Sequence, residues 1–214
     1  MKTYASRIVP LFAATILAAS IPTAAANLGA YTGTIDITGS QANPEVKYKA
    51  RITLTLPVSE NKGSSLTAEF LAGEAPMGKM MLTQYDETFT DKQADVDGKT
   101  SSYKCVLAQP VELPVTVTGV LNADLKAKRH SLSVTVLAMK TALLKCTSAR
   151  VAPYTRNQNV SFTMGTGVPG DQDRVKLPFA DASRLTAKHT LDPTAYTKGK
   201  QGPVVQEWDL KLVK

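Results

Sequence analysis

Only four residues of this chain have a side chain suited to thiol chemistry or to proton transfer near neutral pH. The candidates are two cysteines, Cys105 and Cys146, and two histidines, His130 and His189. In the sequence, His189 lies near Asp181, Ser183 and Asp192. These residue types form nucleophile–base–acid triads, which are defined by geometry and not by chain order. The chain has neither a G-x-S-x-G nor an H-E-x-x-H motif, so a hydrolase is the least favoured of the functions we consider.

Two further patterns resemble parts of ligand sites. Residues 165–170 match the dinucleotide fingerprint G-x-G-x-x-G. That fingerprint holds pyrophosphate at the start of a following helix, whereas acids and a predicted strand follow here, so we interpret the segment as a turn. Met77, Met80 and Met81 offer soft ligands for Cu(I). Neighbouring residues of a strand point to opposite faces, so we interpret these methionines as core-filling side chains.

A group of aspartates resembles a calcium loop. When Gly98 is set at the sixth loop position, Lys104 falls at the twelfth, where a calcium-binding loop needs a bidentate glutamate. The acids that could hold calcium more loosely are Asp91, Asp95, Asp97, Asp171 and Asp173. We interpret them as solvated loop acids, and the sequence predicts neither a metal site nor a cofactor.

The two cysteines fit a disulfide across a β-hairpin. The alternating apolar runs 111–117 and 132–136 predict two strands joined by a turn at 122–129. With paired positions summing to 251, the facing pairs are Val115 with Val136, Val117 with Val134, and Leu113 with Ala138. The same register places Cys105 opposite Cys146. Because side chains alternate between faces, both sulfurs then lie on the apolar face, and we predict a disulfide there.

Two prolines qualify this hairpin. Pro110 and Pro114 lie in its first arm, and proline cannot donate a hydrogen bond to a ladder. We therefore expect the first arm to be an edge strand or to be broken.

The tip of the predicted hairpin is the most basic stretch of the chain. It contains Lys126, Lys128, Arg129 and His130. This patch is a candidate contact for an anionic partner, and the alternative is a charged turn that keeps a sheet edge soluble. Nucleic-acid binding needs interleaved aromatic residues or a known module as well. Since neither is present, we predict no nucleic-acid partner.

Residues 1–26 have the composition of a secretory signal peptide. Lys2 and Arg7 precede an apolar run that ends in small residues at Ala24–Ala26. We expect cleavage before Asn27 and a single β-rich domain at 27–214 with no further transmembrane segment. Loss of the leader lowers the formal net charge from +7 to +5. Export to an oxidising compartment favours the disulfide, and we expect the periplasm or secretion, in a bacterium.

Alternation of apolar and polar residues dominates the rest of the chain. It is perfect from Val46 to Leu56 and returns at 31–37, 66–70, 160–164 and 207–212. We therefore predict an all-β fold: an antiparallel β-sandwich or partly closed barrel with one disulfide-stapled hairpin and little helix. A short helix is expected from Asp181 through Lys188, and a long polar loop over 86–104.

These features favour a non-catalytic role. The main hypothesis is an exported interaction or structural domain of the cell envelope or secretome, such as an adhesin, a pilus-like subunit or an accessory subunit. Its partner would be an envelope protein or an anionic surface, bound through sheet edges or loops. The alternative is a periplasmic or secreted carrier that binds a lipid or a polysaccharide.

Overall fold

The computed structural model describes residues 28–42, 44–70, 78–94, 100–165, 175–192 and 201–214. The predicted leader lies outside these residues. The described segments form eleven strands, which are β1 (Ala30–Gln41), β2 (Glu45–Asn61), β3 (Ser65–Phe70), β4 (Gly78–Ala94), β5 (Thr100–Leu107), β6 (Val111–Asp124), β7 (Arg129–Ser148), β8 (Tyr154–Gly165), β9 (Leu177–Pro178), β10 (Arg184–Leu191) and β11 (Gln201–Val213).

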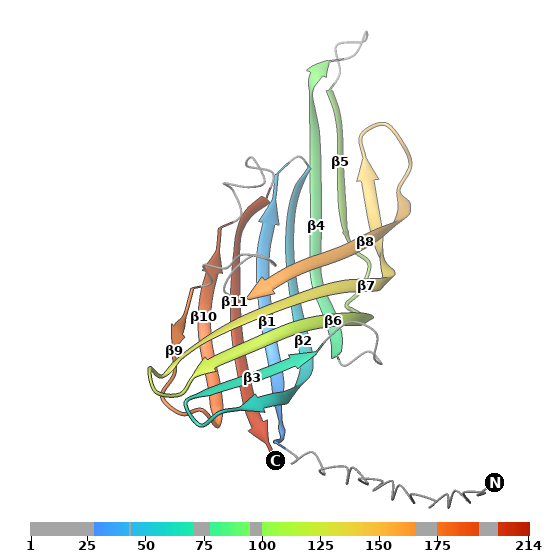
Figure 1. Ribbon diagram of the computed structural model, residues 1–214. Coiled ribbons are helices and arrows are strands. Elements are labelled where there is room, and N and C mark those ends of the chain that lie inside the picture. The colour runs from blue at the N-terminus through green and yellow to red at the C-terminus, as the bar shows by residue number, and fades with distance from the viewer. Residues whose placement is uncertain (1–27, 43, 71–77, 95–99, 166–174, 193–200) are drawn as a thin grey trace, which may run out of the picture.

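All pairings in the described sheet are antiparallel, and the sheet folds over onto itself. Strands β10, β11, β1, β2 and β4 form a first layer, and β3, β6, β7 and β8 cross its face as a second layer (Figure 1). The layers are joined through β2–β3, β4–β6 and the β4–β5–β7 pairings. Within the described residues no pairing links the two edge strands, β10 and β8. Of the two predicted forms, a sandwich or a partly closed barrel, the described residues form the antiparallel β-sandwich, and their sheet stays open.

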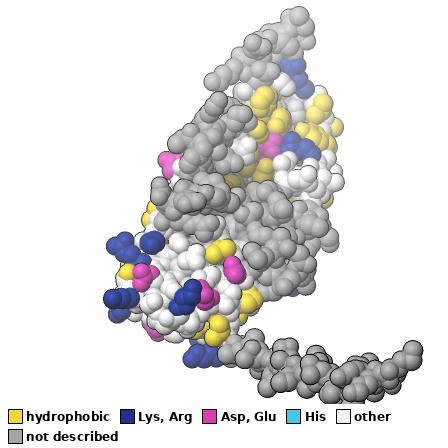
Figure 2. Space-filling model, viewed as in Figure 1, with side chains coloured by type: hydrophobic (Ala, Val, Ile, Leu, Met, Phe, Trp, Pro, Cys, Tyr) yellow, Lys and Arg dark blue, Asp and Glu magenta, His cyan; other side chains and the backbone are white. Residues whose placement is uncertain are grey.

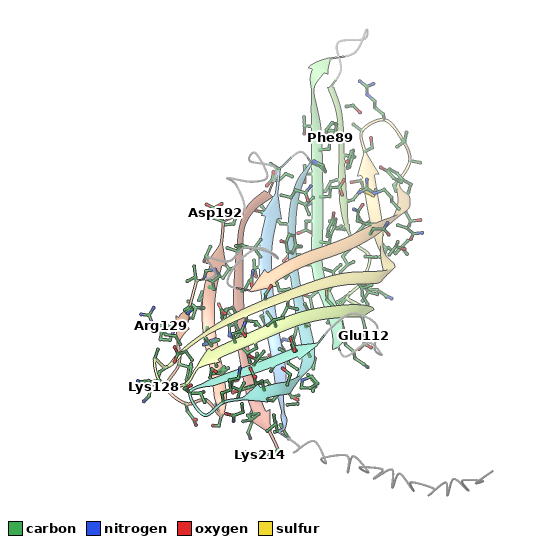
Figure 3. All side chains as sticks on the ribbon, in the orientation of Figure 1. Phe89, Glu112, Lys128, Arg129, Asp192 and Lys214 are labelled. Atoms are coloured by element: carbon green, nitrogen blue, oxygen red, sulfur yellow. A yellow bond between two sulfur atoms is a disulfide. The ribbon has the colours of Figure 1, made fainter. Side chains whose placement is uncertain are left out.

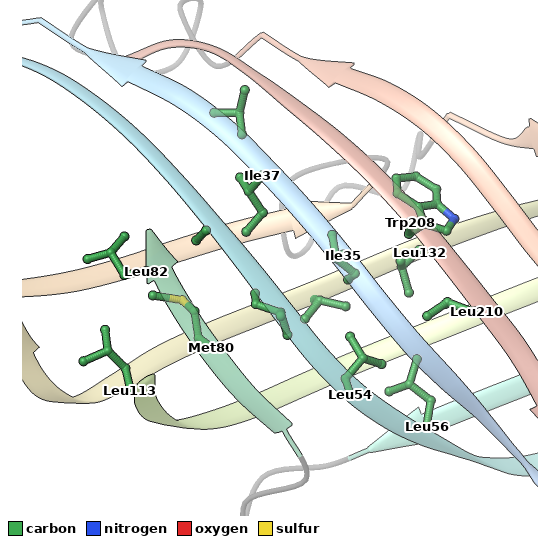
Figure 4. Close-up of a cluster of buried hydrophobic side chains, with 14 of the residues drawn as sticks. Ile35, Ile37, Leu54, Leu56, Met80, Leu82, Leu113, Leu132, Trp208 and Leu210 are labelled. Atoms are coloured by element: carbon green, nitrogen blue, oxygen red, sulfur yellow. The ribbon is translucent and has the colours of Figure 1, made fainter. Parts of the chain in front are cut away.

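Side chains from both layers fill the space between them (Figure 4). On β2, the even-numbered residues Ile52, Leu54 and Leu56 are at most 1% exposed, and the lysines and arginine between Val46 and Leu56 face solvent. Trp208 and Leu210 of β11 are buried, as the alternation predicts. Burial of this apolar area is the main stabilising term of the fold.

The chain forms strands in two places where the sequence predicted otherwise. The expected helix at Asp181–Lys188 is wrong, because residues 184–191 pair with β11 and Leu185 lies opposite Leu210 in the core. Asp181 accepts hydrogen bonds from the backbone N–H and hydroxyl of Ser183, so it stabilises a turn and not a helix. The expected loop at 86–104 is also wrong, since most of it belongs to the β4–β5 pair.

The disulfide prediction is confirmed, although the hairpin around it differs. Cys105 of β5 lies opposite Cys146 of β7, with 4.0 Å between their Cα atoms, and both residues face the core. However, β7 pairs with two successive strands. Its pairing with β6 sets Val117 opposite Val136, two residues away from the predicted register.

The chain breaks where the prolines predicted a break. Pro110 lies in the connection between β5 and β6. Pro114 lies opposite Lys79 of β4, in the part of β6 that precedes its pairing with β7. The register of β5 on β7 therefore need not continue into β6, and the shift of two residues is taken up between them.

Removal of the disulfide should destabilise the fold strongly. The bond closes a loop between residues 41 positions apart, and a loop of this length restricts the unfolded chain by about 4 kcal/mol. We expect the double variant Cys105→Ala, Cys146→Ala to lose about this much free energy of unfolding, measured by denaturant titration. The control is the wild-type protein, titrated without and with a reductant. A loss of free energy of unfolding below about 1 kcal/mol would contradict this account.

Candidate functional site

A groove with a volume of about 460 Å³ lies on the outer face of β3, β6 and β7. Its charged lining residues are Lys126, Arg129, Lys176 and Asp124, and its uncharged polar ones are Ser64, Ser65, Thr67, Asn122 and Ser131. We call this feature the basic groove. Figure 2 shows lysine and arginine side chains at the left margin, where Figure 3 places Lys128 and Arg129 at the β6–β7 turn.

The β6–β7 turn positions two of the cations. The Asp124 carboxylate accepts a hydrogen bond from the Ala127 backbone N–H at 2.8 Å. Lys128 completes the turn in the left-handed region, with φ of 51°. The turn therefore presents Lys126, within it, and Arg129, directly after it, to the same groove.

The third cation comes from a distant part of the chain. Strand β9 pairs with the start of β7, with Pro178 opposite Arg129. The Phe179 backbone N–H donates to the Lys128 carbonyl at 3.0 Å, which ties β9 to the turn. Lys176 directly precedes β9 and so reaches the groove. Sequence reasoning missed Lys176, because only this tertiary pairing brings it near residues 126–129.

The cations of the groove lack acidic partners. Among the described residues, Lys126, Arg129 and Lys176 form no ion pair. On the outer face of the first layer three cations are paired, Arg51 with Asp36, Arg184 with Asp209, and Lys188 with Glu207. Lys49 and Lys211, which are spaced along that layer, have no ion pair among the described residues. A groove of about 410 Å³ on that face contains Lys188 together with Asp36, Glu207 and Asp209. Unpaired positive charge therefore gathers at the basic groove, and this is the arrangement that attracts anions.

The predicted patch of four residues needs one correction. Lys126 and Arg129 line the groove, and Lys128 is exposed in the turn without lining it. His130 is 0% exposed and points into the core, so it cannot contact a partner at the surface. The reason is the alternation of side chains along β7, which sends Arg129 and His130 to opposite faces of the sheet.

His130 instead joins the two layers. The Trp208 indole Nε1–H donates to His130 Nε2 at 3.0 Å. The Trp208 ring meets the imidazole edge-on, and the Phe179 ring packs beside it. Since Nε2 accepts this bond, the neutral ring has its proton on Nδ1. Burial lowers the pKa of His130, and the nearby Leu177 backbone opposes part of that shift. The Nδ1 atom itself has no hydrogen bond of good geometry.

A second polar cluster lies at the opposite end of the sandwich. Glu87 of β4 is 3% exposed, and its two carboxylate oxygens accept from the Tyr103 hydroxyl at 2.7 Å and from Arg156 at 2.5 Å. The pKa of Tyr103 is raised, mainly by burial and secondly by the hydrogen bond to Glu87. Burial, with the Glu87 charge adding, raises the pKa of Tyr85 to about 12. The carboxylate is satisfied by its protein partners, and the cluster joins β4, β5 and β8.

The other sequence candidates that the structure describes do not assemble into sites. Ser183 and His189 lie six positions apart along one chain segment, so an extended backbone separates them by roughly 20 Å and they cannot act as a triad. Met80 is buried and Met81 is exposed, on opposite faces of β4 as predicted, so core filling is right for Met80 and wrong for Met81. No group of three potential metal ligands occurs among the described residues.

Some candidates cannot be placed. Met77, the glycine motif beyond Gly165 and the calcium-candidate acids Asp95, Asp97, Asp171 and Asp173 lie outside the described residues, and the structure gives no side-chain contacts for Asp91.

The fold and the groove together define an all-β, disulfide-bonded sandwich with a basic outer face. Comparison of the chain with protein-family models, with curated proteins and with solved structures gives no match. Within the described ranges, no apolar helix reaches the length needed to cross a bilayer.

The buried His130 should make the fold sensitive to mild acid. Its pKa lies below the unfolded value of 6.5, and the same holds for the half-buried His189. Below pH 6.5 the unfolded chain therefore binds protons that the folded chain does not. The free energy of unfolding should fall by up to about 1.4 kcal/mol per pH unit for each histidine. His130→Gln, whose side-chain oxygen can still accept from Trp208, should show a smaller slope in denaturant titrations between pH 7 and 5. An NMR titration that gives His130 a pKa above 6.5 would contradict this account.

The Glu87 cluster should contribute more to stability than an exposed ion pair does. Arg156→Met leaves a buried carboxylate with one fewer partner, and we expect a loss of about 3 kcal/mol. Arg184→Met is the matched control, because its partner Asp209 is well exposed and such pairs contribute less than about 1 kcal/mol. Equal losses for the two variants in denaturant titrations would contradict the structural role of Glu87.

Proposed function

We propose that this chain is an exported, non-catalytic interaction domain of the cell envelope or secretome, and that it engages an anionic partner through the basic groove. The observation that supports the proposal is the convergence of three unpaired cations from two distant segments: Lys126 and Arg129 at the β6–β7 turn, and Lys176 before β9. The leader-like residues 1–26 support export. The disulfide is consistent with an oxidising, extracytoplasmic environment.

The charge of the groove suits a surface contact. Each exposed lysine or arginine contributes about 1 kcal/mol near an anionic surface, and the contribution falls with ionic strength. Three such residues together give a contact that is reversible and dependent on salt. Asp124 is the one acid among the described lining residues, which therefore have an excess of positive charge.

A carrier that encloses a lipid between the layers has less support. Large side chains from both layers fill the described core, including Ile35, Leu56, Leu121 and Leu132, which are all 0% exposed. Figure 4 shows such side chains from both layers between the sheets. A ligand on the outer face requires no rearrangement of this packing.

Neutralisation of the groove should strongly weaken binding to anionic surfaces. The test variant is Lys126→Gln, Arg129→Gln, Lys176→Gln, and the probe is phosphatidylglycerol vesicles, with phosphatidylcholine vesicles as reference. Loss of about 3 kcal/mol corresponds to binding weakened about 100-fold, measured by vesicle sedimentation at low salt.

A matched control separates the groove from overall charge. Lys49→Gln, Lys145→Gln, Lys211→Gln removes the same charge from exposed positions outside the groove. We expect this variant to bind nearly as well as the wild type. Equal weakening by the two triple variants would reject the groove as the contact site, and no preference for anionic vesicles would reject the contact with an anionic surface.

A further inference from the structure

The floor of the basic groove is chemically different from its cationic end. Two rows of outward-facing side chains cross strands β3, β6 and β7. The first row is Ser65, Asp124 and Arg129, and the second is Thr67, Asn122 and Ser131. Charge is thus confined to the first row and the adjoining lysines. The second row offers the Thr67 hydroxyl and the Asn122 amide, and Ser131 at its end is only 6% exposed.

From this arrangement we infer that the groove binds a sugar that bears an anionic group, such as a phosphate or a carboxylate. The inference rests on the proposed function and specifies the chemistry of the partner. The cations would hold the anionic group, and the polar rows would bind the hydroxyls of the ring. A segment of an acidic polysaccharide and the headgroup of a glycolipid both present this chemistry.

The dimensions of the floor fit a ligand of this kind. Neighbouring strands lie about 4.8 Å apart, and residues two apart on one strand are separated by about 7 Å. Three strands and two rows therefore give a polar floor of roughly 10 by 7 Å. This area matches a sugar ring with its substituents better than a lone inorganic ion.

The hydrogen bonds of the floor favour hydroxyl groups as partners. The Thr67 hydroxyl donates to the Asn122 side-chain oxygen at 3.2 Å, which fixes the amide and leaves its N–H₂ group as a donor. Asp124 offers a charged acceptor beside Arg129. A carboxylate accepts strongly from hydroxyls but repels a bare anion, so it favours a sugar phosphate over phosphate itself.

The lining disfavours two other ligand classes. None of its described residues is aromatic, so no ring is present on which a nucleobase could stack. The apolar lining residues are Leu66 and Ala123, which are at most 4% exposed and face the core. The groove therefore offers little apolar surface to an acyl chain.

In the test, the full exported chain is titrated with each of four small probes, and binding is measured by NMR. Glucose 6-phosphate has both the anion and the hydroxyls, phenyl phosphate and inorganic phosphate have only the anion, and glucose has only the hydroxyls. We expect glucose 6-phosphate to bind about ten-fold more tightly than either anion without hydroxyls, since one charge-assisted hydrogen bond accounts for about this factor. Glucose should bind more weakly still.

Variants connect this selectivity to the floor. Asp124→Asn can still accept from the Ala127 N–H, and it should reduce the preference for glucose 6-phosphate over inorganic phosphate several-fold. Thr67→Val should act in the same direction without a change of charge. Asp86→Asn, an acid on β4 outside the groove, is the matched control and should leave the preference unchanged.

The outcomes separate the inference from the proposed function. If all three phosphate probes bind equally and the groove cations are required, the anionic contact stands and the sugar inference is overturned. Equal binding of glucose and glucose 6-phosphate also overturns it. If no phosphate probe binds and phosphatidylglycerol vesicles are also ignored, both are wrong.

Discussion

Burial of one face of each long strand between two layers of the same sheet is the constraint on which this structure depends. A side chain that alternates inward must find apolar neighbours from the crossing layer, and its sequence neighbour must then face water. Ile52 and Leu54 of β2, Leu132 of β7 and Trp208 of β11 satisfy the first condition. The outer faces are left for polar groups, and the basic groove lies on one of them.

The disulfide and two buried polar contacts connect strands of the interior. The Cys105–Cys146 bond and the Glu87 cluster lie where β4 and β5 lead into the second layer. The Trp208–His130 bond joins the layers near the other end. His130 also lies next to Arg129, so the same short segment anchors the core and presents a cation to the groove.

The two outer faces use their charges differently. Several arginines and lysines of the first layer form ion pairs with acids on the neighbouring strand, as in the Arg184–Asp209 pair, and these exposed pairs contribute little to stability. The cations of the groove have no such partners in the described chain. Among the described residues, these cations form no ion pair that would stabilise the fold. They are therefore available to bind an anionic partner.

The sequence by itself determined the all-β class, the strand cores at 46–56 and 207–212 and the Cys105–Cys146 pair, because side-chain alternation is a local property of an extended chain. Only the tertiary structure decided the strand at Arg184–Leu191, the two-residue register shift between the β5–β7 and β6–β7 pairings, and the burial of His130. Pairing partners, register and the closeness of Lys176 to Arg129 depend on contacts between distant segments. Such contacts are set by the packing of the whole sheet, which local patterns of residues do not record.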